Sequence, residues 1–336
     1  MELTTLWFCL IAFLWIGYFV LEGFDFGVGM LVGILGRNDR ERRVVINTIG
    51  PVWDGNEVWV IVAAGATFAA FPEWYATLFS GFYLPLLLIL VALILRNVAF
   101  DFRGKRTDPA WRRRWDWCII GGSAVPALVW GLAFGNIVHG MPIDANGEYV
   151  GGLLDLFTPF AVLTGLVTLT VFLTHGAVFL ALKTDGEIRH RARRFAGRVG
   201  LVATALAVTL LVWLNLDGGS TVAWGLGGVA ALGLMGGLLA NRLGREGWAF
   251  IGTALAIAAA FTNLFVILFP DVMPSNLDPA WSLTVTNAAS TPYTLTIMSW
   301  AALVATPVVL GYQGWTYWVF RKRITLASIP DDQHAH

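Results

Sequence analysis

The sequence predicts an all-α, polytopic membrane protein with nine transmembrane helices, and three observations lead to this class. First, 57% of the 336 residues are hydrophobic and only 13% are charged. Second, the mean hydropathy of +0.68 is typical of an integral membrane protein. Third, the apolar runs follow one another so closely that no stretch is long enough for a soluble domain. We therefore predict one integral membrane domain over residues 1–323 and a cytoplasmic tail over residues 324–336.

Each predicted span meets the requirement for about 20 mostly apolar residues to cross a hydrocarbon core of ~30 Å. No basic region and no cleavage site precede the first run, so we expect it to be a retained helix that acts as its own insertion signal. In chain order, the predicted spans are 6–33, 50–71, 75–98, 115–139, 154–182, 199–216, 220–240, 247–269 and 293–320.

The connections between these spans form two alternating sets that differ in charge. All 22 Lys and Arg residues lie in one set or at the helix ends that border it, and none lies in the other. Because basic residues favour the cytoplasmic side, we expect the N-terminus outside and the C-terminus in the cytoplasm. Topology and anionic membrane lipids explain this asymmetry without nucleic acid. The basic set is 37–43, 103–115, 183–198, 241–246 and the tail from 321, and the other set is 72–74, 140–150, 217–220 and 270–292.

Two of the spans carry pairs of acidic residues, which are costly in a bilayer and therefore informative. Glu22 and Asp25 lie in the first span, and Asp54 and Glu57 lie in the second. A spacing of three places each pair on one face of its helix. The predicted orientation places both pairs in the cytoplasmic half of the membrane, where Arg96 of the third span is the nearest basic residue.

These residues predict a route for protons. Burial, neighbouring carboxylates and a nearby arginine act on proton affinity in opposite directions, so a mixed cluster can titrate over the working pH range. A histidine on the inner side of the fifth span adds a second kind of proton carrier. The predicted proton-pathway residues are Glu22, Asp25, Asp54, Glu57, Arg96, Asp101 and His175.

Structural interpretations of the same residues stay open at this stage. Asp54 and Glu57 can be interfacial acids that contact the basic segment 37–43. Asp25 can form a purely structural salt bridge to Arg96, and His175 can be a hydrogen-bond donor that holds two helices together.

Several kinds of chemistry lack a signal in the sequence. Cys9 and Cys118 both lie inside apolar runs, so neither a disulfide framework nor a CxxC or haem-attachment motif is present. The five histidines and two cysteines show no metal or iron–sulfur spacing. The glycines of 23-GFDFGVG-29 follow no predicted strand, so they form no phosphate loop and instead favour close helix packing. The residues alone predict a proton-conducting helical bundle with no redox centre of its own.

Several long blocks of the sequence resemble subunit II of the cytochrome bd-type quinol oxidases. The resemblance begins at 20-VLEGFDFGVGML-31 and 46-INTIGPVWDGNEVW-59 and continues through 81-GFYLPLLLILVALILRNVAFDFRGK-105. Later blocks, 115-WDWCIIGGSAVPALVWGLAFGN-136, 273-MPS-275 and 281-WSLTVTNAASTPYTLTIMSW-300, extend it over nearly the whole chain.

The resemblance implies a fold of two four-helix bundles plus one peripheral helix, in a multi-pass protein of the bacterial cytoplasmic membrane. It implies a partner, the haem-bearing subunit I with haems b and haem d, and a quinol substrate. It implies that subunit II binds no haem, stabilises the complex, supplies cytoplasmic protons for the reduction of dioxygen to water and, in some members, holds a quinone. It also allows for small single-helix subunits.

The resemblance carries over to individual residues of the acid pairs. Asp54 matches the acid of the family's WDGN motif, and Asp25 matches the acid of its GFD motif. Arg96 matches the basic residue at the inner end of the third helix, Glu22 stands where some relatives carry aspartate, and Glu57 stands at a position that is not always acidic.

Two other functions compete with an oxidase subunit. A proton-coupled secondary transporter would use the same acids to bind its coupling ion, although no convincing internal repeat is found. A purely structural assembly subunit would leave the acid pairs without a chemical role.

Overall fold

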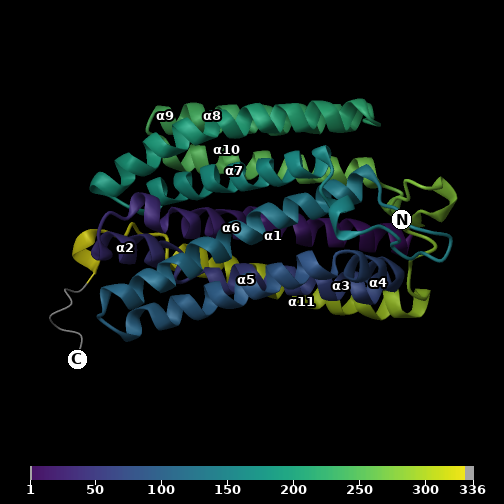
Figure 1. The fold of residues 1–336 in the computed structure, drawn as a ribbon, viewed down its shortest axis with the longest axis horizontal. Coiled ribbons are helices and arrows are strands. Elements are labelled where there is room, and N and C mark those ends of the chain that lie inside the picture. The colour runs from purple at the N-terminus through teal and green to yellow at the C-terminus, as the bar shows by residue number, and fades with distance from the viewer. Residues whose placement is uncertain (1, 330–336) are drawn as a thin grey trace.

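The computed structural model describes residues 2–329 and is almost entirely helical (Figure 1). A two-stranded antiparallel sheet joins β1 and β2 near one end of the helices. The helices are α1 (Leu3–Leu35), α2 (Asp39–Ile49), α3 (Trp53–Ala70), α4 (Pro72–Gly81), α5 (Tyr83–Phe102), α6 (Pro109–His139), α7 (Pro159–Lys183), α8 (Gly186–Leu216), α9 (Thr221–Arg242), α10 (Glu246–Leu268) and α11 (Pro292–Val319); the strands are β1 (Asp271–Met273) and β2 (Leu283–Thr284).

Eight of the described helices are long and apolar enough to cross a membrane, namely α1, α5 to α10 and α11. The remaining predicted span, 50–71, corresponds to α3, which has 18 residues. At 1.5 Å per residue α3 is about 27 Å long, close to the ~30 Å of a hydrocarbon core. Its first turns contain Asp54, Asn56 and Glu57, which make it less apolar than the other eight.

Three differences between the helix limits and the predicted spans are the largest. The basic connection after the first span contains a short helix, α2, which begins after Asn38, whose side chain accepts a hydrogen bond from Glu41 N. The predicted span 75–98 is divided at Phe82 into α4 and α5. Helix α8 begins at Gly186 instead of residue 199, because the arginine-rich segment before the apolar run is itself helical. Hydropathy shows where the apolar residues of a helix lie, but it does not show where the helix ends, because a helix can continue into the polar residues beside the apolar run.

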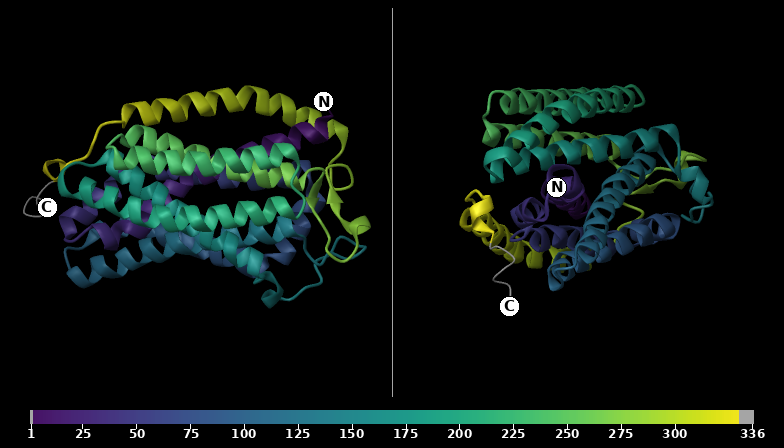
Figure 2. Two further views of the ribbon diagram at one scale, coloured as in Figure 1. Left: turned by 90° about the horizontal axis from the view of Figure 1, so that it is seen from above. Right: turned by 60° about the vertical axis from the view of Figure 1, so that its left-hand side comes forward.

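Helix α1 lies at the centre of the molecule and contacts α3, α6, α7 and α10. Helices α7 to α10 contact one another in sequence, and α10 also contacts α7. In Figure 1 the pair α8 and α9 lies along one edge, opposite the edge with α3, α5 and α11. Helix α11 runs along the outside of the molecule (Figure 2), and Leu295 is the one residue of this helix that is fully buried.

The basic segments gather at one end of the helices, as the two alternating sets of connections predicted. Arg103 lies 2.5 Å from Asp116 and 2.7 Å from Asp39, and Arg191 lies 2.7 Å from Glu41. These ion pairs join segments that are far apart in the sequence into one charged layer. Residues 324–329 of the predicted tail pack here through the 3₁₀ turn Leu326–Ser328, whereas residues 330–336 lie outside the described part of the chain.

The opposite end is closed by an ordered cap that includes segment 270–292. Met141 N donates to Pro274 O at 3.0 Å, and Ser275 Oγ donates to Ile143 O at 2.7 Å. Met273 is completely buried in this cap. The two loops 140–150 and 270–292 therefore form one unit.

Candidate functional site

Three helices bring charged side chains together inside the protein. Glu22 and Asp25 of α1 and Arg96 of α5 are completely buried. Arg96 Nη1 lies 2.5 Å from Glu22 Oε1 and 3.8 Å from Oε2 of Glu57, which comes from α3. One buried cation thus lies among three carboxyl groups. We call Glu22, Asp25, Glu57 and Arg96 the carboxyl cluster.

Close helix packing and two aromatic rings fix the position of Arg96. A Cβ atom on Gly122 of α6 would lie 2.6 Å from Ala92 O and 2.7 Å from Arg96 Cβ, so α6 can approach α5 only because a glycine stands there. The guanidinium carbon lies 5.0 Å from the centroid of Phe26 and 5.3 Å from that of Phe100. Such cation–π contacts stabilise a cation that has left water.

Asp25 is held by amide and hydroxyl groups of two other helices. Asn56 Nδ2 donates to Asp25 Oδ2 at 2.6 Å. Asn56 Oδ1 accepts hydrogen bonds from Gln313 Nε2 at 3.0 Å and from Tyr317 OH at 2.7 Å. Gln313 Oε1 in turn accepts from Trp59 Nε1 at 2.7 Å. We call Asn56, Trp59, Gln313 and Tyr317 the amide network; it joins α3 and α11 to the carboxyl cluster.

The acids become less exposed from the surface toward α1. Asp54 at the start of α3 and Asp101 at the end of α5 are exposed. The side chain of Glu57 is 13% exposed and accepts a hydrogen bond of 2.9 Å from Asn97 Nδ2. The Glu22 side chain is 0% exposed. The predicted acids therefore form a graded series between the surface and the interior.

Within the described residues, the partners of Asp25 and Glu57 differ from those that their structural interpretations require. Arg96 pairs with Glu22, and Asp25 is bonded to Asn56 instead of forming the salt bridge with Arg96 that one alternative required. Glu57 pairs with Arg96 and not with the basic segment 37–43.

His175 lies on α7, on the side of α1 that faces α10. Its Nε2 lies 3.2 Å from Val20 O and its Nδ1 lies 2.7 Å from Thr253 Oγ1. A carbonyl oxygen can only accept, so Nε2 donates to Val20 O, and Nδ1 shares a hydrogen bond with the Thr253 hydroxyl. The ring also stacks on Phe250, with centroids 4.7 Å apart. In the described part of the chain, His175 makes no hydrogen bond or ion pair with the carboxyl cluster.

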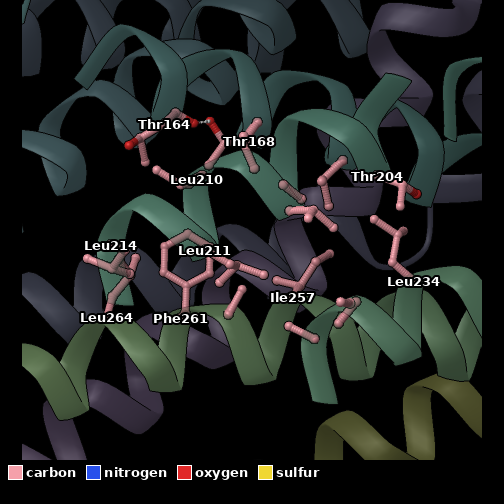
Figure 3. A pocket seen from close by; sticks show the side chains of 18 of the residues that line it. Thr164, Thr168, Thr204, Leu210, Leu211, Leu214, Leu234, Ile257, Phe261 and Leu264 are labelled. Atoms are coloured by element: carbon pink, nitrogen blue, oxygen red, sulfur yellow. Dashed lines mark hydrogen bonds between the residues drawn. The ribbon is translucent and has the colours of Figure 1, made fainter. Parts of the chain in front are cut away.

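A separate cavity lies between α7, α8, α9 and α10 (Figure 3). Its volume is about 60 Å³, and aliphatic and aromatic side chains such as Leu211 and Phe261 line it. The hydroxyl groups of Thr164 and Thr204 in its wall donate to carbonyl oxygens of their own helices. This cavity offers no charged group, so the candidate site is the carboxyl cluster.

Sequence reasoning found the acids and Arg96 but missed the amide side chains that hold them. Asn56, Asn97 and Gln313 each stand in or next to an apolar run. An amide in a span needs a hydrogen-bond partner, and this signal could have identified all three. No group of three or more His, Cys, Asp or Glu side chains placed to hold a metal ion occurs among residues 2–329.

The fold and the site define a class, a multi-pass helical membrane protein with a buried carboxyl cluster that reaches the surface near its basic end. The family model described as cytochrome bd terminal oxidase subunit II matches residues 3–320. The chain belongs to this family, as its sequence blocks predicted, and it is a multi-pass protein of the bacterial cytoplasmic membrane.

Two relatives illustrate the similarity. The chain is 44% identical over 331 residues to the cytochrome bd ubiquinol oxidase subunit 2 of Bacillus subtilis (strain 168), covering 96% of this chain and 97% of the relative. It is 37% identical over 368 residues to the cytochrome bd-I ubiquinol oxidase subunit 2 of Escherichia coli (strain K12), covering 98% and 97%.

A solved structure has the same fold. The structure of the bd oxidase from Geobacillus thermodenitrificans contains a chain that is similar with a TM-score of 0.78 at 18% identity, covering 95% of this chain and 99% of that one. Membership of an oxidase-subunit family supports the oxidase interpretation over a proton-coupled transporter.

Proposed function

We propose that this chain is the haem-free subunit II of a bd-type quinol oxidase and that it conducts cytoplasmic protons toward the oxygen-reducing haem of subunit I. The complex would oxidise a quinol, reduce dioxygen to water and separate charge across the membrane without a pumping step. The haems b and haem d would belong to the partner. The observation that supports this function is the buried carboxyl cluster, whose member Glu57 follows the exposed Asp54 by three residues on the same helix.

The cluster suits proton transfer because of its charge balance. Arg96 can compensate the charge of one carboxylate, and a further carboxyl group that carries a proton adds no uncompensated charge to the cluster. Protons would enter at Asp54, assisted by Asp101, and pass through Glu57 to Glu22 and Asp25. The atoms Glu22 Oε2, Asp25 Oδ1 and Glu57 Oε2 are buried without a hydrogen-bond partner in the described protein, which supports bonding to ordered water.

His175 would have an indirect part in this route. Its two ring nitrogens tie α7 to α1 and α10, so it would hold α1, the helix of Glu22 and Asp25, in place. We retain it as a positioning residue of the proposed pathway.

The placement of the site supports a topology and a partner face. We propose nine spans, with α3 as the second, an external N-terminus, and two four-helix bundles with α11 as the peripheral helix. The faces of α3 and α5 expose large apolar side chains beside the cluster, including Ile61, Leu90 and Ile94. Subunit I would cover this face and be stabilised by it, and lipids and small single-helix subunits would cover other exposed faces.

An apolar groove of about 550 Å³ between α1, α3 and α11 is the proposed place for a bound quinone. Its lining includes Trp59 and Gln313, which are amphipathic or polar, beside aliphatic side chains such as Val62 and Val309. Extraction of the purified complex followed by mass spectrometry tests this assignment, and the variant Val62→Trp, which fills the groove, should lower the amount of quinone recovered.

The first experiment identifies the complex. A tag on this chain should recover a second polytopic subunit in equal amount and a reduced-minus-oxidised spectrum with bands of b-type haem and chlorin-type haem d. Recovery of the chain alone and without haem would contradict an oxidase subunit.

The second experiment tests the proton pathway. In the purified complex, Asp54→Asn should slow oxygen consumption by about tenfold or more, because a positioned proton carrier contributes at least that much, while the haem absorbance per complex stays unchanged. Glu73→Gln, at an exposed acid next to the outer cap, is the matched control and should retain full activity. Loss of haem or of the partner in Asp54→Asn would instead assign this residue a structural role.

A further inference from the structure

A groove of about 760 Å³ lies between α8 and α9 at their basic ends. These two helices form the edge opposite α3 and α5 (Figure 1), the helices that carry Glu57, Arg96 and the proposed partner face. The walls of the groove combine basic residues with leucines, among them Arg194, Arg242, Leu201 and Leu239. The proposed proton pathway does not involve this groove.

The basic and apolar residues occupy different levels of the groove. On α8, His190 and Arg194 are one turn apart, and Leu201 follows two turns later on the same face. On α9, which runs in the opposite direction, Leu238 precedes Arg242 by one turn. At 1.5 Å per residue, Arg194 and Leu201 are separated by about 10 Å along the axis. The groove thus places basic residues at the level of the membrane surface and leucines at the level of the hydrocarbon. A phospholipid has its charged headgroup and its acyl chains at these same two levels.

The two arginines of the groove keep donors available for a ligand. Arg194 and Arg242 are exposed, and neither forms an ion pair in the part of the chain that the structure describes. Arg194 Nε has a weak bond of 3.4 Å to His190 O, which leaves its two terminal nitrogens unengaged. Arg193 differs, because its guanidinium donates to Asn241 O and Arg242 O at the end of α9. Glu187 is the one carboxylate in the lining.

Gly197 keeps the groove open at the level between charge and hydrocarbon. A Cβ atom at Gly197 would meet nothing within 4 Å, whereas one at Gly200 would collide with Leu238. The two helices are therefore in close contact at Gly200 but separated at Gly197. The space beside Gly197 is continuous with the exposed leucines, of which Leu201 is 69% and Leu239 is 57% exposed.

We propose that this groove is a binding site for an anionic phospholipid of the phosphatidylglycerol type. Arg194 and Arg242 hold its phosphate, His190 adds a polar contact, and an acyl chain lies along Leu201, Leu238 and Leu239. Free phosphate lacks the hydrocarbon that the apolar half of the groove receives. Each arginine near an anionic lipid surface strengthens binding by about fivefold, so removal of both should weaken binding by about tenfold or more.

Lipid retention by the purified complex tests the proposal. Delipidated complex is titrated with dioleoylphosphatidylglycerol, dioleoylphosphatidylcholine or inorganic phosphate, and bound lipid is counted by native mass spectrometry. One phosphatidylglycerol should bind in preference to phosphatidylcholine. The double variant Arg194→Ala/Arg242→Ala should lose it by about tenfold or more, and Gly197→Leu should lose it with all charges intact. Arg198→Ala, an exposed arginine outside the lining, is the control and should bind normally.

Three outcomes would overturn the proposal. They are equal binding of the two lipids, unchanged binding in both groove variants, and competition by inorganic phosphate at concentrations comparable to the lipid. Oxygen consumption is measured in parallel. Normal activity with lost lipid would leave the proposed proton pathway intact, and slow turnover of Asp54→Asn with normal lipid binding would separate the two functions.

Discussion

Replacement of Arg96 by methionine should destabilise the protein strongly, because it removes the single cation of the carboxyl cluster. Arg96 is completely buried and lies 2.5 Å from the equally buried Glu22. Removing one partner of a buried ion pair costs about 3–5 kcal/mol, since the other charge stays behind without compensation. The contacts with Phe26 and Phe100 add to this loss, at about 0.5–2 kcal/mol for a desolvated cation–π pair.

A double-mutant cycle separates the charge effect from lost packing. Glu22→Leu/Arg96→Met removes both charges and keeps apolar volume, so its free energy of unfolding should recover most of the loss. The coupling energy between the two positions should therefore exceed about 1 kcal/mol. Arg198→Met, at an exposed arginine of α8, is the matched control and should change stability by less than about 0.5 kcal/mol.

Unfolding in mixed micelles of increasing SDS content, followed by tryptophan fluorescence, measures these free energies. Two results would refute the reasoning. One is an Arg96→Met variant within about 1 kcal/mol of the Arg198→Met control, and the other is additive behaviour of the two single variants. Either result would mean that water solvates the carboxylates of the cluster, so that the cluster is not a desolvated site.

Three further predictions concern the surroundings of the site and the outer cap. Asn56→Leu removes the donor to Asp25, which should cost about 1.5–3 kcal/mol and slow oxygen consumption at unchanged haem content; full activity would contradict a positioning role. Gly176→Ala places a methyl group against the backbone of Gly27 and should cost about 1–3 kcal/mol in SDS unfolding, whereas Gly121→Ala, with nothing within 4 Å of its Cβ, should not destabilise. The N–H groups of Glu148 and Asn146 lower the pKa of Asp144, so this turn gains stability above the ordinary aspartate pKa and loses it as the pH falls through the lowered value. Hydrogen exchange of loop 140–150 should show that loss, and Asp144→Ala should abolish its pH dependence.

The sequence predicted the membrane class well, because this class depends on a pattern that no single residue can change. Apolar runs located eight helices that the structure also has as candidate spans, and the segregation of Lys and Arg predicted the charged layer at one end. Glu22 and Asp25, the pair found by its spacing of three, are both completely buried in α1.

The finer geometry could not be predicted, because it depends on contacts between distant segments. The division at Phe82 and the helix α2 leave no mark in hydropathy, which averages over about 19 residues. Which carboxyl group Arg96 pairs with depends on how α1, α3 and α5 are placed relative to one another, and no local pattern contains that information. Asn56 stood inside the WDGN block, but its bond to Asp25 requires the packing of α1 on α3.

The amide network explains how a nearly unburied helix can belong to the site. Apolar contact does not drive helices together in lipid, because hydrocarbon tails are as apolar as leucine, and polar side chains supply directional contacts instead. Helix α11 buries only Leu295, yet Gln313 and Tyr317 both donate to Asn56, which also donates to Asp25. The same amide thus anchors the last helix and orients the acid. A change that loosens α11 must therefore also disturb Asp25, so assembly of the peripheral helix and the geometry of the carboxyl cluster are coupled through one side chain.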